Sequence, residues 1–330
     1  MPDESPTSVP NPPEPASSGE APAWERELLE RLAFMALVEQ RRTRRWNLVF
    51  RCAWLALAVA VAVFWMDPGW LRPEPGGPHS ALVDVRGMIA DEGDANADQV
   101  VAGLRAAFED SDTAGVILRI NSPGGSPVQA GYISDEIVRL RGLYPETPVY
   151  AVVSDMAVSG GYYVAAAADS IYASKSSVVG SIGVLVDGFG FVDAMTRLGV
   201  ERRLVTAGEH KGLLDPFSPA RDEDVAHLRS LLDDVHDEFI EVVKRGRGDR
   251  LAADPDIFSG LMWTGAQGIE LGLVDAFGSS GYVAREVIGA EEIVDFTVRP
   301  APLDAIADRL GASVARTFGA MLNLEVGRLE

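Results

Sequence analysis

Short apolar runs alternate with segments of helical periodicity between residue 80 and about residue 245. The apolar runs predict strands at 81–89, 115–120, 148–153, 170–173 and 182–186, and a further strand is predicted at 201–205. The periodic segments predict helices at 96–110, 128–143, 162–169, 192–198 and 222–245. Strands that alternate with helices in this way are typical of an α/β domain.

An earlier apolar run, from Trp46 to Met66, is long enough to cross a bilayer, which takes about 20 residues. Four arginines lie in the five residues directly before it, at 41–45. A cleavable signal peptide would begin near the N-terminus, and a buried core helix would not adjoin such a cluster. We therefore expect a transmembrane helix at 46–66, with the arginines on the cytoplasmic side and the following domain outside the cytoplasm.

The segments around this helix differ in composition. Residues 1–45 form a predicted cytoplasmic tail, which is rich in Pro, Ser and Glu at first and then reads as an amphipathic helix from Glu25 to Gln40. A Pro- and Gly-rich linker is expected at 67–79. The α/β domain is predicted at 80–294, followed by an extension at 295–330 that we interpret as a surface for contact between subunits.

Charge and cysteine content exclude several classes of function. The chain has 330 residues and a formal charge of −20, almost all of it after residue 66, so nucleic acid is not expected as a partner. Cys52 is the only cysteine, and the four histidines have no ligand spacing, so neither a disulfide framework nor a metal site is predicted. No phosphate loop or dinucleotide fingerprint occurs, so no cofactor is expected.

The string Val158-Ser159-Gly160-Gly161-Tyr162-Tyr163 joins a predicted strand to an Ala-rich helical run. A serine at a strand-to-helix turn, with helix N–H groups behind it, can present its hydroxyl as a nucleophile. The alternative is a helix N-cap with a glycine turn. The choice depends on which other groups the chain supplies to this serine.

A second glycine turn, Asn121-Ser122-Pro123-Gly124-Gly125, also follows a buried strand and precedes a helix. Its backbone N–H groups, together with that of Gly160, would suit a developing oxyanion. The alternative is a plain strand–turn–helix connection.

A serine nucleophile needs a base, and the segment from Thr206 to Lys211 supplies two candidates after a predicted strand. His210 would give a Ser/His arrangement and Lys211 a Ser/Lys dyad. A lysine can act as a base only when burial near the site keeps it neutral, and most lysines are solvated surface charges. The residues alone leave both candidates open.

Five motifs, in order over about 80–290, resemble those of peptidase family S49, the signal peptide peptidase A family. They are Asn121 to Gly125, Met156 to Tyr163, Val179 to Val184, Ala207 to Lys211, and Trp263 to Gln267 continued by Gly272 to Asp275. The resemblance implies a ClpP/crotonase-like spiral of repeated ββα units. It also implies Ser159 as nucleophile, Lys211 as general base, and an oxyanion hole at Gly124, Gly125 and Gly160. His210 then has no catalytic role, and Ser181 is a candidate for orienting the lysine.

The single catalytic unit resembles the short form of the family. This implies a ring-like homo-oligomer that brings serine and lysine together across subunits. It further implies a single-pass protein of the bacterial inner membrane, in contact with lipid, that hydrolyses remnant signal peptides and other short unfolded peptides. The alternatives are the neighbouring SohB subtype with another substrate, a crotonase-like acyl-CoA enzyme, and a non-catalytic scaffold.

Overall fold

The computed structural model describes residues 31, 44–62, 77–93 and 95–299, which fall into two compact units divided between Arg72 and Pro73. Several sequence predictions concern residues outside these ranges. They are the tail at 1–30, almost all of the amphipathic helix at 25–40, the end of the apolar span at 63–66, most of the linker, and the extension after residue 299.

Apart from residue 31, the described part of the first unit is a helix, Arg44–Ala62. It has 19 residues and a mean hydropathy of 1.3, and none of it is buried against other residues. Among the described residues it is the one helix whose length and composition would allow it to cross a bilayer. It overlaps the span that the sequence predicts from Trp46 onward.

The second unit is built on an eight-stranded sheet in which β6, β5, β3, β2, β1 and β8 lie side by side, and β4 pairs with β3 and β7. Only the β5–β6 pairing is antiparallel. The strands are β1 (His79–Arg86), β2 (Thr113–Ser122), β3 (Val149–Val158), β4 (Ser170–Ala173), β5 (Val178–Gly180), β6 (Met262–Thr264), β7 (Ala276–Phe277) and β8 (Ile293–Asp295).

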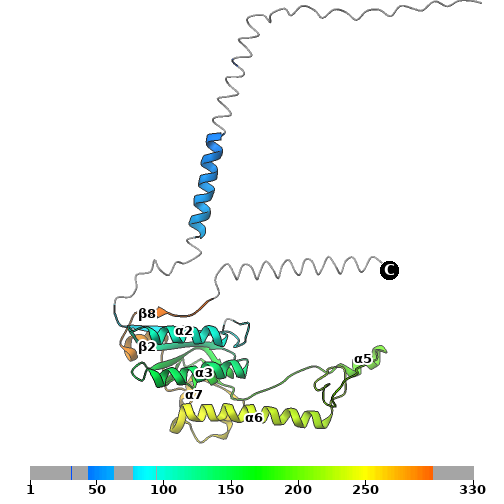
Figure 1. Ribbon diagram of the computed structural model, residues 1–330. Helices are drawn as coiled ribbons and strands as arrows, with labels where there is room; N and C mark the ends of the chain where they lie inside the picture. The colour runs from blue at the N-terminus through cyan, green and yellow to red at the C-terminus, as the bar shows by residue number, and fades with distance from the viewer. Residues whose placement is uncertain (1–30, 32–43, 63–76, 94, 300–330) are drawn as a thin grey trace, which may run out of the picture. The chain divides into compact units, whose positions relative to one another are not determined.

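Helices follow most of the strands (Figure 1). The α-helices are α2 (Ala97–Glu109), α3 (Pro127–Leu143), α4 (Gly160–Ala165), α5 (Val192–Leu198), α6 (Asp222–Arg247), α7 (Gly265–Glu270) and α8 (Ser280–Tyr282). The shorter 3₁₀ and π segments are η2 (Gly248–Arg250), η3 (Pro255–Phe258) and η4 (Val283–Ile288).

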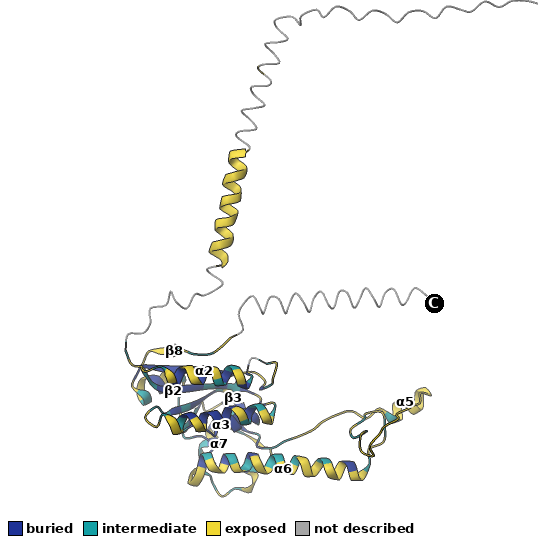
Figure 2. Cartoon of the chain, viewed as in Figure 1, coloured by how far each residue is buried: buried dark blue, intermediate teal, exposed yellow. Residues whose placement is uncertain are grey.

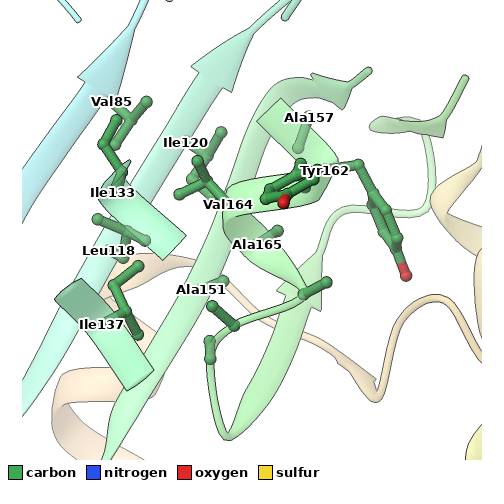
Figure 3. Close-up of a cluster of buried hydrophobic side chains, with 14 of the residues drawn as sticks. Val85, Leu118, Ile120, Ile133, Ile137, Ala151, Ala157, Tyr162, Val164 and Ala165 are labelled. Atoms are coloured by element: carbon green, nitrogen blue, oxygen red, sulfur yellow. The ribbon is translucent and has the colours of Figure 1, made fainter. Parts of the chain in front are cut away.

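The main core lies between one face of the sheet and helices α2, α3 and α4. Alternate residues of each strand point to this face, as expected for a pleated strand. The close-up shows side chains of β1 to β3 meeting those of α3 and α4 (Figure 3). The opposite face carries a smaller cluster, made of Leu82, Ile117, Val152, Val283 and Ala284. The helices are therefore buried on their inner sides and exposed outside, as Figure 2 shows for α2 and α3.

This architecture confirms the predicted α/β class. Two predicted strands, however, are absent, because residues 182–186 and 201–205 have no neighbouring strand with which to form a ladder. Both segments contain β-branched or apolar residues that suit a strand, but a strand is defined by its hydrogen-bonded partner. The strand in this region is the shorter β5, which ends at Gly180 and pairs with β3 and β6.

Between β5 and α6 the chain leaves the sheet and forms an exposed arm, which we define as residues 184–220. The arm includes α5 and extends beside the N-terminal part of α6 (Figure 1). Helix α6 itself is buried mainly toward its C-terminal end, through Phe239, Val243 and Arg247. Figure 2 shows the arm as exposed along nearly all its length.

Candidate active site

Ser159 lies where β3 ends and α4 begins, and its backbone conformation is unusual. Its φ of 52° and ψ of −127° lie outside the regions that non-glycine residues favour. The conformation is held by hydrogen bonds from Ser159 N to Gly180 O at 2.9 Å, and from Tyr162 N and Tyr163 N to Ser159 O. A strained strand-to-helix turn of this kind exposes a serine hydroxyl for reaction.

A glycine turn packs directly against this serine. Gly124 has a φ of 96°, and a Cβ atom built on it would lie 2.6 Å from Ser159 Cβ and 2.8 Å from Gly160 N. Such distances are below van der Waals contact, so no larger residue fits at position 124. The turn and the serine are thus held closer together than side chains would allow.

The hydrogen-bond pattern of the turn leaves an amide available. Ile89 N donates to Gly124 O, and Ser126 N donates to Ile89 O, each at 2.8 Å. Ile89 thereby bonds to the residues on both sides of Gly125, so the N–H of Gly125 itself points to the opposite side. A Cβ built on Gly160 would lie 3.4 Å from Gly125 N, so that side faces the start of α4.

Gly160 supplies the second amide. It is the first residue of α4, and the N–H of such a residue has no partner within the helix. The structure therefore brings together four of the five predicted site residues: Ser159, Gly124, Gly125 and Gly160. Two amides beside a serine hydroxyl can stabilise the oxyanion of an acyl-transfer intermediate.

The backbone behind Ser159 is firmly supported. A Cβ built on Gly161 would lie 3.0 Å from Ser122 O, so α4 packs closely on the end of β2. The buried Tyr162 hydroxyl donates to Leu273 O at 2.9 Å, and this complete burial raises its pKa above the usual value for tyrosine. The hydroxyl stays neutral, and the turns that form the site are anchored to buried elements of the core.

Ser159 opens into a cleft of about 1000 Å³ between α3, α6 and the segment after β5. Its apolar walls include Met88, Val128, Tyr132, Val184, Leu185 and Phe239. Its polar residues include Ser181, Asp135, His236 and Glu238. Ser181, like Ser159, has a φ of 52°. The combination of apolar walls and a few polar groups is typical of a binding site.

The sequence analysis did not identify three of these polar residues as part of the site. Asp135, His236 and Glu238 occur on charged helices in which no motif marks them. His236 Nε2 lies 3.1 Å from Ile182 O, which links α6 to the segment after β5. The helical spacing of α6 was the available signal, but it does not show which side faces the cleft until α6 is packed against α4.

Lys211 lies apart from the other predicted site residues. It belongs to the arm, where its turn spans 207–214, and it is exposed. It is not among the residues that line the cleft of Ser159. Within one chain, therefore, the structure does not bring the serine and the lysine together.

The turn before Lys211 is nevertheless attached firmly to the start of α6. His210 Nδ1 lies 2.6 Å from Asp224 Oδ1, and Arg221 Nε donates to Asp224 Oδ2 at 2.7 Å. Arg221 also donates to Glu209 O at 3.0 Å. Hydrogen bonds from Arg221, and then from His210, hold the pKa of Asp224 below its usual value. The carboxylate is thus charged and holds the lysine-bearing turn to the helix.

The same side chains have the composition of a metal site. Ligand atoms of His210, Glu223 and Asp224 lie within 4.8 Å of one another. Arg221, however, forms ion pairs with both carboxylates, at 3.1 Å to Glu223 and 2.7 Å to Asp224. Because a guanidinium already neutralises them, we assign this cluster to the attachment of the turn.

Comparison with known proteins adds a family match. Residues 143–292 match the model of peptidase family S49. A protein of Synechocystis named "Putative protease slr0021" is 31% identical over 200 residues, which are 60% of this chain and 69% of that protein. A protein of Enterococcus faecium named "Putative signal peptide peptidase SppA" is 29% identical over 235 residues, 68% of each chain.

Another similar protein has a different name. A Brucella abortus protein named "Na(+)/H(+) antiporter NhaA" is 44% identical over 186 residues, which are 56% of this chain. The chain spans only 25% of the length of that relative. Most of the antiporter thus lies outside the match.

Proposed function

The chain belongs to peptidase family S49, and on this premise we propose that it is a serine endopeptidase with a Ser/Lys dyad. Ser159 is the nucleophile, Lys211 is the general base, and the amides of Gly125 and Gly160 form the oxyanion hole beside Gly124. The observation that carries this proposal is the strained Ser159 turn, packed against the glycine turn at the floor of an open cleft.

The proposed reaction proceeds through an acyl-enzyme. Neutral Lys211 Nζ takes the proton from Ser159 Oγ, which attacks the carbonyl carbon of the peptide bond. The oxyanion accepts hydrogen bonds from the two amides until the C–N bond breaks, and the leaving amine takes the proton from Lys211. A water molecule, deprotonated by the same lysine, then attacks the ester, releases the acid product and restores the serine hydroxyl.

We further propose that Lys211 acts on Ser159 of a second copy of the chain. Two observations support this step: Lys211 does not line the cleft of its own chain, and the arm that carries it exposes many apolar side chains. These include Leu185, Phe189, Leu198, Val205 and Leu214, of which Val205 is 95% exposed. A surface of this kind is expected to be covered by another protein surface. A closed homo-oligomer would cover every arm in the same way.

The proposed substrates are remnant signal peptides and other short unfolded peptides. Within the described chain, the backbone groups of residues 183–185 along the cleft have no hydrogen-bond partner. An extended peptide could pair with this free backbone and bury its apolar side chains in the cleft. The name of the Enterococcus faecium relative agrees with this substrate class.

The helix Arg44–Ala62 suits a membrane anchor, and we propose a single-pass protein of the bacterial inner membrane. Arg44 and Arg45 at its start favour a cytoplasmic N-terminus, with the peptidase unit on the other side. Membrane lipid is then a partner of this helix. Peptides left in the membrane would be accessible to an enzyme anchored in this way.

Three single substitutions in the full-length, detergent-solubilised protein test the dyad. Ser159→Ala and Lys211→Ala should each lower kcat for an apolar fluorogenic peptide by at least about 10³-fold, because each removes a member of the reacting pair. A serine-directed covalent probe should label the native protein and not Ser159→Ala. If Lys211→Ala stays active while His210→Ala is inactive, the base is the histidine and the dyad is wrong. If none of the three matters, the chain is not this peptidase.

A further inference from the structure

The cleft of Ser159 carries two carboxylates in addition to its apolar walls. Asp135 comes from α3 and Glu238 from α6, so the two side chains approach the cleft from different elements. Both residues are exposed. Nothing in the proposed hydrolysis uses either of them, so their role has to be sought in the binding of the substrate.

Neither carboxylate is neutralised within the described chain. Asp135 has no basic side chain within ion-pair distance, whereas its neighbour Glu136 contacts Arg105 and Arg139 at 2.6 Å each. The carboxylate that faces α2 thus has a guanidinium partner from each of the two helices, whereas the one that faces the cleft has none among the described residues. A positively charged ligand could therefore pair with Asp135.

Helix α6 shows the same contrast. Among the described residues Glu238 has no basic partner, while Glu241, almost one turn further on, is paired with Lys244 at 3.2 Å. Glu238 instead accepts a hydrogen bond from the hydroxyl of Tyr163 at 3.3 Å. Its carboxylate is therefore held at the cleft by a neutral donor and not by an ion pair.

Tyr163 connects both carboxylates to one point of the cleft. Its side chain is only 7% exposed, and it lies on α4 one turn after Ser159. Burial first, then the charge and hydrogen bond of Glu238 and the charge of Asp135, raise the pKa of Tyr163 to about 12, against a smaller lowering by the positive charge of Arg245. The neutral hydroxyl thus lies within the electrostatic field of both carboxylates. Asp135 and Glu238 converge on the wall of the cleft where Tyr163 is buried.

The surroundings of this point are apolar. The ring of Phe239 lies 5.1 Å from that of Tyr163, centroid to centroid, and Val128 and Tyr132 of α3 line the same cleft. A lysine or arginine side chain combines a long apolar stem with a charged end. Such a side chain could lie along these apolar walls and bring its charge to the two carboxylates.

We propose that Asp135 and Glu238 form a subsite for a lysine or arginine side chain of the peptide substrate. This inference rests on the proposed function, because the ligand is the peptide that Ser159 cleaves. Tyr163 follows Ser159 by one helical turn, roughly 6 Å along the axis. An extended peptide rises roughly 3.3 Å per residue, so the cationic residue lies at least about two positions from the scissile bond.

The subsite would make the enzyme prefer peptides that combine an apolar run with a nearby positive charge. Signal peptides have this composition, because a positively charged segment precedes their apolar segment. A peptide with a glutamate at the same position would instead bring a third negative charge to the cleft, and like charges at close range are unfavourable. Charge, in addition to apolar character, then selects the substrate.

The test uses a set of matched fluorogenic peptides with the native full-length protein. Each peptide has the same apolar sequence, with lysine, norleucine or glutamate placed in turn at positions two to four from the scissile bond. At one of these positions, kcat/KM for the lysine peptide should exceed that for the glutamate peptide by about 10-fold. The double variant Asp135→Asn/Glu238→Gln should reduce this ratio to about 1, because it removes both the partner of the lysine and the repulsion of the glutamate.

A charge-matched variant is the control. Asp233→Asn/Asp237→Asn removes two negative charges from α6 at residues that do not line the cleft. It should keep the preference for lysine. If it loses the preference to the same degree, the effect is a general one of net charge and the subsite is wrong. The subsite is also wrong if the native protein cleaves lysine and glutamate peptides equally at every position.

Binding to Ser159→Ala separates this inference from the proposed function. Fluorescence anisotropy with labelled lysine and glutamate peptides needs no turnover. Tighter binding of the lysine peptide, abolished when Asp135→Asn/Glu238→Gln is added, supports the subsite even if the native protein hydrolyses no peptide. Hydrolysis without any difference between the two peptides supports the peptidase and overturns the subsite.

Discussion

At the scale of single residues, the candidate site depends on backbone conformations that side chains oppose. Ser159 adopts a positive φ, and Gly124 lies so close to it that a Cβ atom would overlap the serine. The motif Ser-Gly-Gly marks the first of these features in the sequence. The second is a contact between Gly124 and Ser159, which are 35 positions apart. The sequence shows the glycines that permit this contact but not the contact itself.

Replacement of Gly124 tests this contact. Gly124→Ala should lower kcat by at least about 10²-fold, because the added Cβ would lie 2.6 Å from Ser159 Cβ and would displace the serine from the amides. Steady-state kinetics on an apolar peptide measure the effect. Gly142→Ala is the control, since a Cβ at that position in α3 has nothing within 4 Å and should leave kcat unchanged. Equal kinetics for the two variants would contradict the proposed geometry.

At the scale of elements, charged side chains join the helices that cover the sheet. Glu136 of α3 binds Arg105 of α2 at 2.6 Å and Arg139 of its own helix at the same distance. Hydrogen bonds from Arg139, and then from Arg105, lower the pKa of Glu136 to about 2. The ionised carboxylate therefore stabilises the packing of α2 against α3.

This ion pair predicts a pH dependence of stability. Because the pKa of Glu136 falls from 4.5 to about 2 on folding, its contribution is present above pH 4.5 and is lost as the pH falls toward 2. Glu136→Gln should lower the free energy of unfolding by about 1–3 kcal/mol at pH 7, and the difference from native should vanish near pH 2. Thermal unfolding between pH 7 and pH 2 measures it. Glu241→Gln, at an exposed ion pair, should behave like the native protein at every pH. A Glu136→Gln difference that persists at low pH would argue against this origin.

At the scale of the whole molecule, the arm separates Lys211 from the cleft of its own chain while a cluster at Asp224 keeps its turn attached to α6. An ordered lysine turn next to an exposed apolar surface is what a shared active site requires. A single chain would then hold the nucleophile of one site and the base of another.

Mixed assemblies test whether sites are shared. Ser159→Ala and Lys211→Ala chains, co-expressed with different affinity tags and purified through both, should regain about a quarter of native activity, since random assembly pairs an intact serine with an intact lysine at that frequency. Each variant alone should be inactive. Doubly tagged assemblies that stay inactive, with both variants folded, would show that serine and lysine must come from one chain.

The sequence alone determined the α/β class, the strand–helix order from β1 to β4 and the serine turn, because these depend on local periodicity and on residues such as glycine with special backbone freedom. The apolar span from Trp46 could also be predicted, because composition alone identifies such a segment. The absence of strands at 182–186 and 201–205, and the position of Lys211 outside its own cleft, were decided by tertiary structure. Whether an apolar segment is paired, covered or exposed depends on which neighbours reach it. For the same reason the convergence of Asp135, Glu238 and Tyr163, from three helices, could be found only in the folded chain.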